Sequence, residues 1–165
     1  MEKIWSPWRS KYIESFKNEN SEKGCVFCDS LKNPSNENSL IIYQDKATFI
    51  ILNLYPYNNG HLMVVPKRHL SDFSELTIHE HAEIMKNIDL SIKALKIVLQ
   101  PHGFNIGANL GRVAGAGIDT HLHFHIVPRW NGDTNFMPVL GEIKVISQDL
   151  LKTKNSLIDA IKSLI

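Results

Sequence analysis

The sequence predicts an α+β fold, in which an antiparallel β-sheet of about five strands packs against one long helix and a carboxyl-terminal helix. Three observations predict it: short apolar runs separated by turn clusters, one long segment of helical periodicity, and an apolar stripe of helical spacing near the end. The length of 165 residues favours a single domain. Within it we expect residues 1–39 to be an amino-terminal extension, 40–130 the core, and 131–165 a carboxyl-terminal strand and helix.

The middle of the chain carries most of the predicted strands. Residues 39–43 and 47–54 are apolar runs, the second with β-branched and aromatic members, and a third run at 61–66 ends at Pro66. The cluster at 55–60 contains Tyr, Pro, Asn and Gly, which predicts a turn and a hairpin between the second and third strands. Further strands are predicted at 104–110 and, more briefly, at 142–146.

Two segments have helical periodicity. Thr77 and Glu80 have the spacing of a capping box, which predicts a helix start, and Pro101 marks its end about six turns later. Ser147 is the predicted cap of a last helix. The apolar stripe of that helix consists of Leu151, Leu157, Ile158, Ile161 and Ile165.

The composition is that of an ordinary globular chain, with 43% hydrophobic and 21% charged residues. The net charge of +1 is too small to attract a nucleic acid or an anionic membrane, so we expect neither a nucleic acid polymer nor a membrane as partner. No apolar run approaches the roughly 18 to 20 residues of a membrane span, and the first residues contain no apolar signal core. With only two cysteines, we expect a reducing, cytoplasmic setting.

The stretch from His121 to Val127 alternates three histidines with apolar residues. On a strand, a period of two places the imidazoles of His121, His123 and His125 on one face. A neutral imidazole can act as nucleophile, general base or metal ligand. The spacing suits either two ligands of a zinc ion or a nucleophile with orienting neighbours. Strict alternation behind a glycine-rich loop favours a functional role over simple solvent exposure.

The loop at residues 111–117 contains three glycines, which can adopt backbone angles closed to other residues. Successive N–H groups can then point into one concavity and bind an anion, typically phosphate. Beside a histidine nucleophile, this implies attack on phosphorus with backbone donors on the equatorial oxygens. Asn109 precedes the loop and can donate to a bridging or leaving oxygen, or can simply satisfy the loop backbone.

The pattern His-φ-His-φ-His-φ-φ, with φ apolar, is matched in full by residues 121–127. It resembles the histidine-triad (HIT) family of nucleotide hydrolases and transferases. Residues 59–69 look like the family's Gly-His-hydrophobic-Pro-x-x-His segment, and Asn53 stands where the family places a ribose-binding acid or amide. The resemblance covers roughly residues 25–130 and implies a HIT-like fold.

The resemblance also implies catalytic roles. His123 would attack the α-phosphorus and form a covalent nucleotidyl-histidine, and His125 would hold phosphate and protons beside it. His121 and Asn109 complete the set of catalytic candidates. The sequence departs from the family in one place: Gly117 and Ile118 stand where many members carry Gln and Ser or Thr, so backbone N–H groups are expected to replace side-chain contacts.

The binding roles follow in the same way. Asn53 would bind ribose, with Ile51 and Leu54 lining the base pocket. Trp130 would border the active site, and its alternative role is that of a core aromatic at a strand end. The backbone contacts to phosphate are expected from Gly115, Ala116 and Gly117.

The pair Cys25-x-x-Cys28 has three readings: a disulfide, a redox pair or half of a zinc site. The expected reducing compartment disfavours a disulfide. A thioredoxin-like redox pair would need a βαβ context, which is absent from the predicted elements. The family supplies the other two zinc ligands, here His69 and His121. The resemblance therefore implies a closed, structural Zn²⁺ site and no organic cofactor, with free thiols as the alternative.

The flanks at residues 5–9, 103–107 and 127–138 resemble the bacterial branch that includes diadenosine tetraphosphate phosphorylases. The implied reaction is cleavage of a dinucleoside polyphosphate, with phosphate or water as acceptor. Family members are commonly dimers, which implies a homodimer with a small nucleotide as ligand. Two other functions stay open: a zinc-dependent hydrolase with its metal on the triad, and a non-catalytic nucleotide-binding module.

Overall fold

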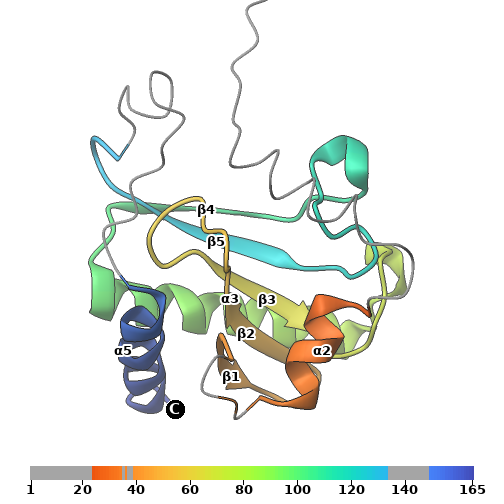
Figure 1. The fold of residues 1–165 in the computed structure, drawn as a ribbon, viewed down its shortest axis with the longest axis horizontal. Coiled ribbons are helices and arrows are strands. Elements are labelled where there is room, and N and C mark those ends of the chain that lie inside the picture. Colours follow the sequence, from red (N-terminus) through yellow and green to blue (C-terminus); the bar gives the residue numbers. More distant parts are fainter. Residues whose placement is uncertain (1–23, 35, 37–38, 134–148) are drawn as a thin grey trace, which may run out of the picture.

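The computed structural model describes residues 24–34, 36, 39–133 and 149–165. Its sheet has five strands in the order β1-β2-β3-β5-β4, and every neighbouring pair is antiparallel. The predicted α+β class is therefore confirmed (Figure 1). The elements are α2 (Val26–Lys32), β1 (Ile41–Gln44), β2 (Thr48–Leu52), β3 (Leu62–Pro66), η1 (Phe73–Glu75), α3 (Ile78–Leu99), β4 (Gly103–Gly107), η2 (Arg112–Ala114), β5 (Phe124–Arg129) and α5 (Leu150–Lys162).

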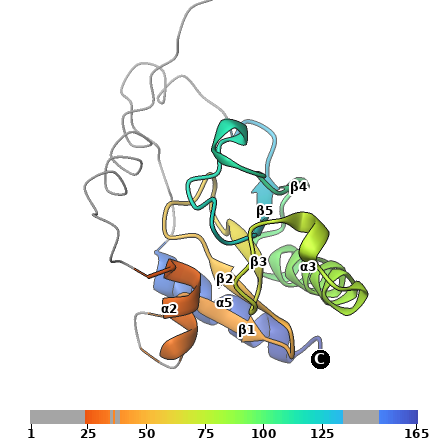
Figure 2. The same cartoon turned by 90° about the vertical axis from the view of Figure 1, so that its right-hand side faces the viewer.

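Helices cover both faces of the sheet. The long helix α3 lies along one face, and α2 lies on the other (Figure 2). Every residue of β2 and β3 is buried because odd and even positions face different layers. Ile50 and Val64 belong to the core cluster on the side of α3 and α5, whereas Phe49 and Met63 pack with Phe27 of α2. The α2 face carries the candidate functional site.

The long helix begins as predicted. The Thr77 side chain accepts from the Glu80 N–H, and the Glu80 carboxylate accepts from the Thr77 N–H in return. Arg68 adds a guanidinium at 2.8 Å from the Glu80 carboxylate. This ion pair and the cap hold the pKa of Glu80 at about 2, and they fasten the loop after β3 to the start of α3.

The histidine stretch is only partly a strand, which corrects the prediction. β5 begins at Phe124, so His121 and His123 precede it. The chain leaves the ladder because the Leu122 N–H donates to the Leu70 carbonyl, and the His121 ring bonds the carbonyl of Pro66. The alternation survives nevertheless: Leu122 is buried in the core cluster on the α3 side, and the three imidazoles point the other way.

The last helix also differs from the prediction. It begins at Leu150, and Asp149 caps it by accepting from the Lys152 N–H, so the predicted cap at Ser147 is wrong. Of the predicted stripe, Leu157 and Ile161 are buried and Ile158 packs against the core cluster, whereas Leu151 and Ile165 are exposed. The buried residues of this helix are Thr153, Leu157, Ala160 and Ile161.

Two predicted features lie outside the described residues, namely the short strand at 142–146 and the Trp-Ser-Pro-Trp-Arg segment at 5–9. Among the helices that the structure describes, none combines the length and the apolar character that crossing a bilayer demands.

Candidate active site and metal cluster

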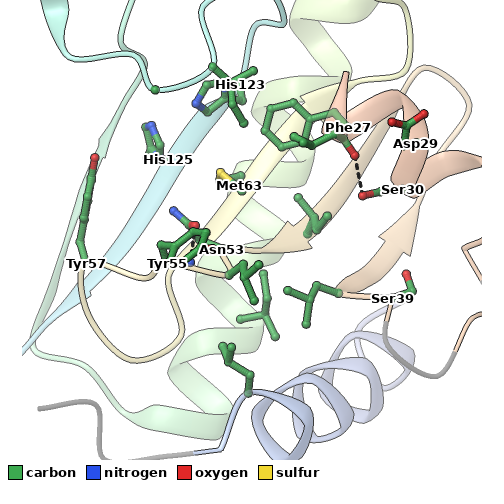
Figure 3. A pocket seen from close by; sticks show the side chains of 18 of the residues that line it. Phe27, Asp29, Ser30, Ser39, Asn53, Tyr55, Tyr57, Met63, His123 and His125 are labelled. Carbon is green, nitrogen blue, oxygen red and sulfur yellow. Dashed lines mark hydrogen bonds between the residues drawn. The ribbon is translucent and has the colours of Figure 1, made fainter. Parts of the chain in front are cut away.

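A cavity of about 1150 Å³ opens on the α2 face of the sheet. Its walls come from α2, the end of β2, the 55–57 turn, the loop at 109–118 and the start of β5. Seven of its lining residues were singled out from the sequence as binding or phosphate-contacting groups: Ile51, Asn53, Leu54, Asn109, Gly115, Ala116 and Gly117. His123 and His125 stand side by side in it (Figure 3). The cavity therefore brings together most of the predicted catalytic and nucleotide-binding residues, with the exceptions of His121 and Trp130.

The ring of His123 is held in one tautomer. Its Nδ1 lies 2.8 Å from the backbone carbonyl oxygen of His121, so Nδ1 carries the hydrogen and donates it. The lone pair is then on Nε2, the other ring nitrogen. His123 is only 5% exposed, and this burial lowers its pKa, which keeps the ring neutral near pH 7. A neutral imidazole with a free lone pair is a competent nucleophile.

The ring of His125 is held in the opposite tautomer by a chain of hydrogen bonds. The Tyr57 N–H donates to Nδ1 of His61 at 3.0 Å, so His61 carries its hydrogen on Nε2. That Nε2–H donates to Nδ1 of His125, also at 3.0 Å. His125 therefore carries its hydrogen on Nε2. Within the described part of the chain, this buried Nε2 meets no hydrogen-bond partner, which leaves it as a donor for a ligand.

Burial lowers the pKa of His125 to about 4, with a smaller contribution from neighbouring His123. Both rings are thus neutral near pH 7, and their centroids are 4.8 Å apart. The site presents a lone pair on one ring and an N–H donor on the next. This pair suits attack on an electrophilic centre that also carries anionic oxygens.

Two of the three loop glycines have the predicted left-handed backbone, but the predicted phosphate contacts are contradicted at two positions, because the Gly115 and Ala116 N–H groups donate to the Arg112 and Gly111 carbonyls within the loop. Gly111 and Gly115 have φ of +79° and +92°, in the region that favours glycine, and the Arg112–Ala114 turn lies between them. Asn109 faces the cavity, and its side-chain Nδ2 lies at the long distance of 3.5 Å from the Gly115 carbonyl. Its amide therefore spans the loop weakly, and a better acceptor can displace that contact.

The predicted nucleoside contacts are placed as follows. Asn53 accepts from the Tyr55 N–H through Oδ1, which directs its Nδ2 toward His61 at 3.3 Å. Ile51 is buried and Leu54 is exposed at the cavity rim. Trp130 is not among the described residues that line the cavity. It lies in the turn after β5, where its N–H donates to Asp133.

The third triad histidine faces away from the cavity, toward the cysteines. His121 is 1% exposed, and its Nε2 donates to the Pro66 carbonyl at 2.9 Å. Its Nδ1 lone pair consequently points at Cys25 Sγ, 3.2 Å away, and at Cys28 Sγ, 3.7 Å away. His69 Nδ1 lies 3.4 Å from Cys28 Sγ. We call these four residues the Cys₂His₂ cluster.

The Cys₂His₂ cluster has the dimensions of a tetrahedral metal site. Its four ligand atoms all lie within 4.8 Å of one another, and neither cysteine is in a disulfide. Sulfur and nitrogen ligands of one tetrahedral zinc are about 3.6 Å apart, close to the distances observed. A ligating histidine normally donates its second N–H to a carbonyl, as His121 does here. The donor set and its orientation therefore fit zinc.

Three residues of the site were missed by the sequence analysis as functional groups: Phe27, Tyr57 and His61. His61 lay inside the quoted Gly-His segment, but nothing local shows that it meets His125, 64 positions away. The antiparallel pairing of β3 with β5 brings them together. Arg112 also lines the cavity and forms an ion pair of 2.7 Å with Asp119.

Comparisons with known proteins agree with this geometry. A HIT domain model matches residues 35–132. The chain is 41% identical over 162 residues to AP-4-A phosphorylase of Mycobacterium tuberculosis, covering 95% of this chain and 83% of that protein. It is 35% identical over 125 residues to an uncharacterized HIT-like protein of Methanocaldococcus jannaschii, covering 76% of this chain and 93% of that one.

A solved structure, the Zn-bound histidine triad family protein from Mycobacterium smegmatis, superposes with a TM-score of 0.69 at 27% sequence identity. The superposition covers 86% of this chain and 95% of the other. Since the family model spans more than half of the chain and takes in His61 together with the whole triad, the protein belongs to the HIT domain family.

Proposed function

We propose that the protein is a nucleotidyl transferase or hydrolase that cleaves dinucleoside polyphosphates, with diadenosine tetraphosphate as the favoured substrate. The observation that carries the proposal is the pair of opposite tautomers, a lone pair on His123 beside an N–H donor on His125. Support for the substrate comes from the 41% identity to AP-4-A phosphorylase.

In the first step, His123 Nε2 attacks the α-phosphorus. A phosphorus–nitrogen bond forms, and the bond from phosphorus to the bridging oxygen breaks. The nucleoside polyphosphate departs with the electron pair of that bond. The His125 Nε2–H donates a hydrogen bond to the phosphate oxygens as charge builds on them, and the side-chain amide of Asn109 does the same from the loop.

This arrangement suits a phosphoanhydride. A departing polyphosphate is a stable anion near neutral pH, so it needs a hydrogen bond and no full proton transfer. Neutral His125 supplies such a bond, whereas its low pKa makes it a poor reservoir of protons at pH 7.

In the second step, an acceptor attacks phosphorus from the side that the leaving group vacated. The phosphorus–nitrogen bond breaks, and its electron pair returns to His123 Nε2. Diadenosine tetraphosphate yields ATP in the first step, and the second yields ADP with phosphate or AMP with water. The products therefore identify the acceptor.

The test is incubation with diadenosine tetraphosphate, with and without inorganic phosphate, and product identification by mass. We expect ATP in both cases and ADP only with phosphate. His123→Gln should lower turnover at least about a thousandfold, since it removes the nucleophile. His79→Gln, a change at an exposed histidine on α3, is the matched control. Wild-type turnover in His123→Gln excludes the mechanism.

We also propose that the Cys₂His₂ cluster binds one structural Zn²⁺. The metal would tie the start of α2 to the loop after β3 and to the first triad histidine, and so supply folding energy there. Metal analysis should give one zinc per chain, lost on joint Cys25→Ser and Cys28→Ser replacement. Retention of zinc in that double variant favours the alternative of a metal on the triad.

We propose further that the protein is a cytoplasmic homodimer. β4 is at the sheet edge, and Ile106 on it is 49% exposed, so a second copy can pair there. Light scattering should report a dimer, and Ile106→Glu should give a monomer. Free cysteines accord with a reducing compartment.

A further inference from the structure

Phe27 stands between the two halves of the site. It lies in the sequence between the two cysteines of the Cys₂His₂ cluster, and it is only 2% exposed. Its ring centroid is 5.4 Å from that of His121 and 5.1 Å from that of His123. Figure 3 shows the ring beside His123 at the edge of the cavity. One side chain therefore touches both a cluster histidine and the candidate nucleophile.

The helix that carries Phe27 has few other attachments. α2 has seven residues, which is too short for a stable helix on its own. Cys25 is its N-cap residue and makes no side-chain cap bond, and Phe27 is its one fully buried residue. Two partly buried residues, Cys25 and Leu31, pack against the same apolar cluster. The sulfur contacts to His121 and His69 are thus a large share of what fixes the helix.

The orientation of His123 depends on what surrounds its ring. The hydrogen bond from Nδ1 to the His121 carbonyl is local, between residues two positions apart. Rotation of the ring breaks that bond and turns Nε2 away from the cavity. Phe27 contacts the ring on one side and His125 contacts it on another. Removal of the Phe27 ring leaves room for such a rotation.

We propose that Phe27 is a positioning residue that couples metal occupancy of the Cys₂His₂ cluster to the orientation of the His123 ring. With zinc bound, the cysteines hold α2 against the sheet, and Phe27 keeps Nε2 of His123 directed into the cavity. Without zinc, α2 loosens, Phe27 withdraws and His123 becomes free to rotate. The cavity also loses one wall. This inference rests on the proposed zinc site, and its main readout does not depend on the proposed reaction.

The test uses nitrogen-15 histidine NMR on the full chain, because it reports which ring nitrogen carries hydrogen. In the zinc-loaded wild type we expect His123 to be a single Nδ1–H tautomer. Removal of zinc by a chelator should give a tautomer mixture at His123, and zinc addition should restore the single form. Binding of AMP, followed by calorimetry, should weaken at least about tenfold in the zinc-free protein.

The Phe27→Leu variant tests the role of the aromatic ring separately from the role of the metal. The variant should keep one zinc per chain, yet show the tautomer mixture at His123 and at least about tenfold lower turnover. Phe49→Leu is the matched control, because Phe49 is buried in the same cluster and touches Phe27 without a ring contact to the histidines. The Phe49→Leu variant should lose stability to a similar degree. It should keep the single Nδ1–H tautomer at His123, and its turnover should stay within about threefold of the wild type.

Two results overturn the inference. One is a zinc-free wild type whose His123 stays in the Nδ1–H tautomer and binds AMP as before. The other is an equal effect of Phe27→Leu and Phe49→Leu on the His123 signal. If Phe27→Leu fails to fold, the zinc-removal experiment on the wild type still decides. A protein that cleaves no dinucleoside polyphosphate contradicts the proposed function alone, since the histidine signals are read without substrate.

Discussion

The low pKa of His125 makes the stability of the fold depend on pH in a way that can be calculated. Its folded pKa of about 4 compares with an ordinary value of 6.5. Between these pH values the unfolded chain binds a proton at this ring and the folded chain does not. Stability therefore falls as pH falls from 6.5 toward 4. The full difference is about 3 kcal/mol, and about 2 kcal/mol of it is lost between pH 7.5 and pH 5.

The measurement is urea unfolding of the zinc-saturated protein at pH 7.5 and at pH 5, compared with the same pair for His125→Gln. Glutamine keeps a polar side chain and does not titrate. The pH-dependent contributions of all other groups, including the Cys₂His₂ cluster, are common to both proteins and cancel when their losses of stability are compared. We expect the wild type to lose about 2 kcal/mol more than the variant over this range. Equal losses in the two proteins would show that the folded ring takes up its proton normally, and the argument for a neutral N–H donor would fail.

Three further predictions concern the parts that hold this site. His61→Phe keeps a ring but removes the donor to His125, so turnover should fall about ten- to a hundredfold with little change in KM. A fall in steady-state turnover of about twofold or less would contradict this role of the His61–His125 hydrogen bond. Glu80→Gln should destabilise the fold by about 2 kcal/mol at pH 7. The difference in stability should be present above pH 4.5 and lost as the pH falls toward 2, because the native carboxylate has a pKa of about 2. Thermal unfolding of both proteins across this pH range measures the difference. Gly60→Ala should lower the free energy of unfolding by about 2 kcal/mol or more, since φ is +71° and a Cβ would collide with side chains of α3. Gly103→Ala is the control: it has open space around it and should lower the free energy of unfolding by less than about 1 kcal/mol in the same assay.

Much of the fold follows from local sequence. The hairpin of β2 and β3, the capping box at Thr77 and the end of α3 were all predictable, because each depends on residues within a few positions of one another. The pattern that marked His121 to Val127 as exceptional is likewise local. What failed was the extent of the strand, because its start depends on bonds from Leu122 to Leu70 and from His121 to Pro66.

The site shows the same division. Sequence alone identified the three histidines, the glycine loop and the cysteine pair, because residue type and spacing fix what chemistry each can do. It could not assign a tautomer to any ring, because a tautomer is set by the hydrogen-bond partner, and those partners come from distant segments. His61 reaches His125 only because β3 pairs with β5. Phe27 meets His123 only because α2 folds onto the sheet.

The sequence by itself thus determined that this chain carries a histidine triad on an α+β scaffold, together with the ligand types for a zinc ion. The tertiary structure decided which ring presents a lone pair to the cavity, which ring presents an N–H donor and which ring faces the cysteines. The physical reason is that imidazole is chemically ambiguous: its two nitrogens exchange roles, and only the acceptor or donor placed against one of them fixes what the other can do.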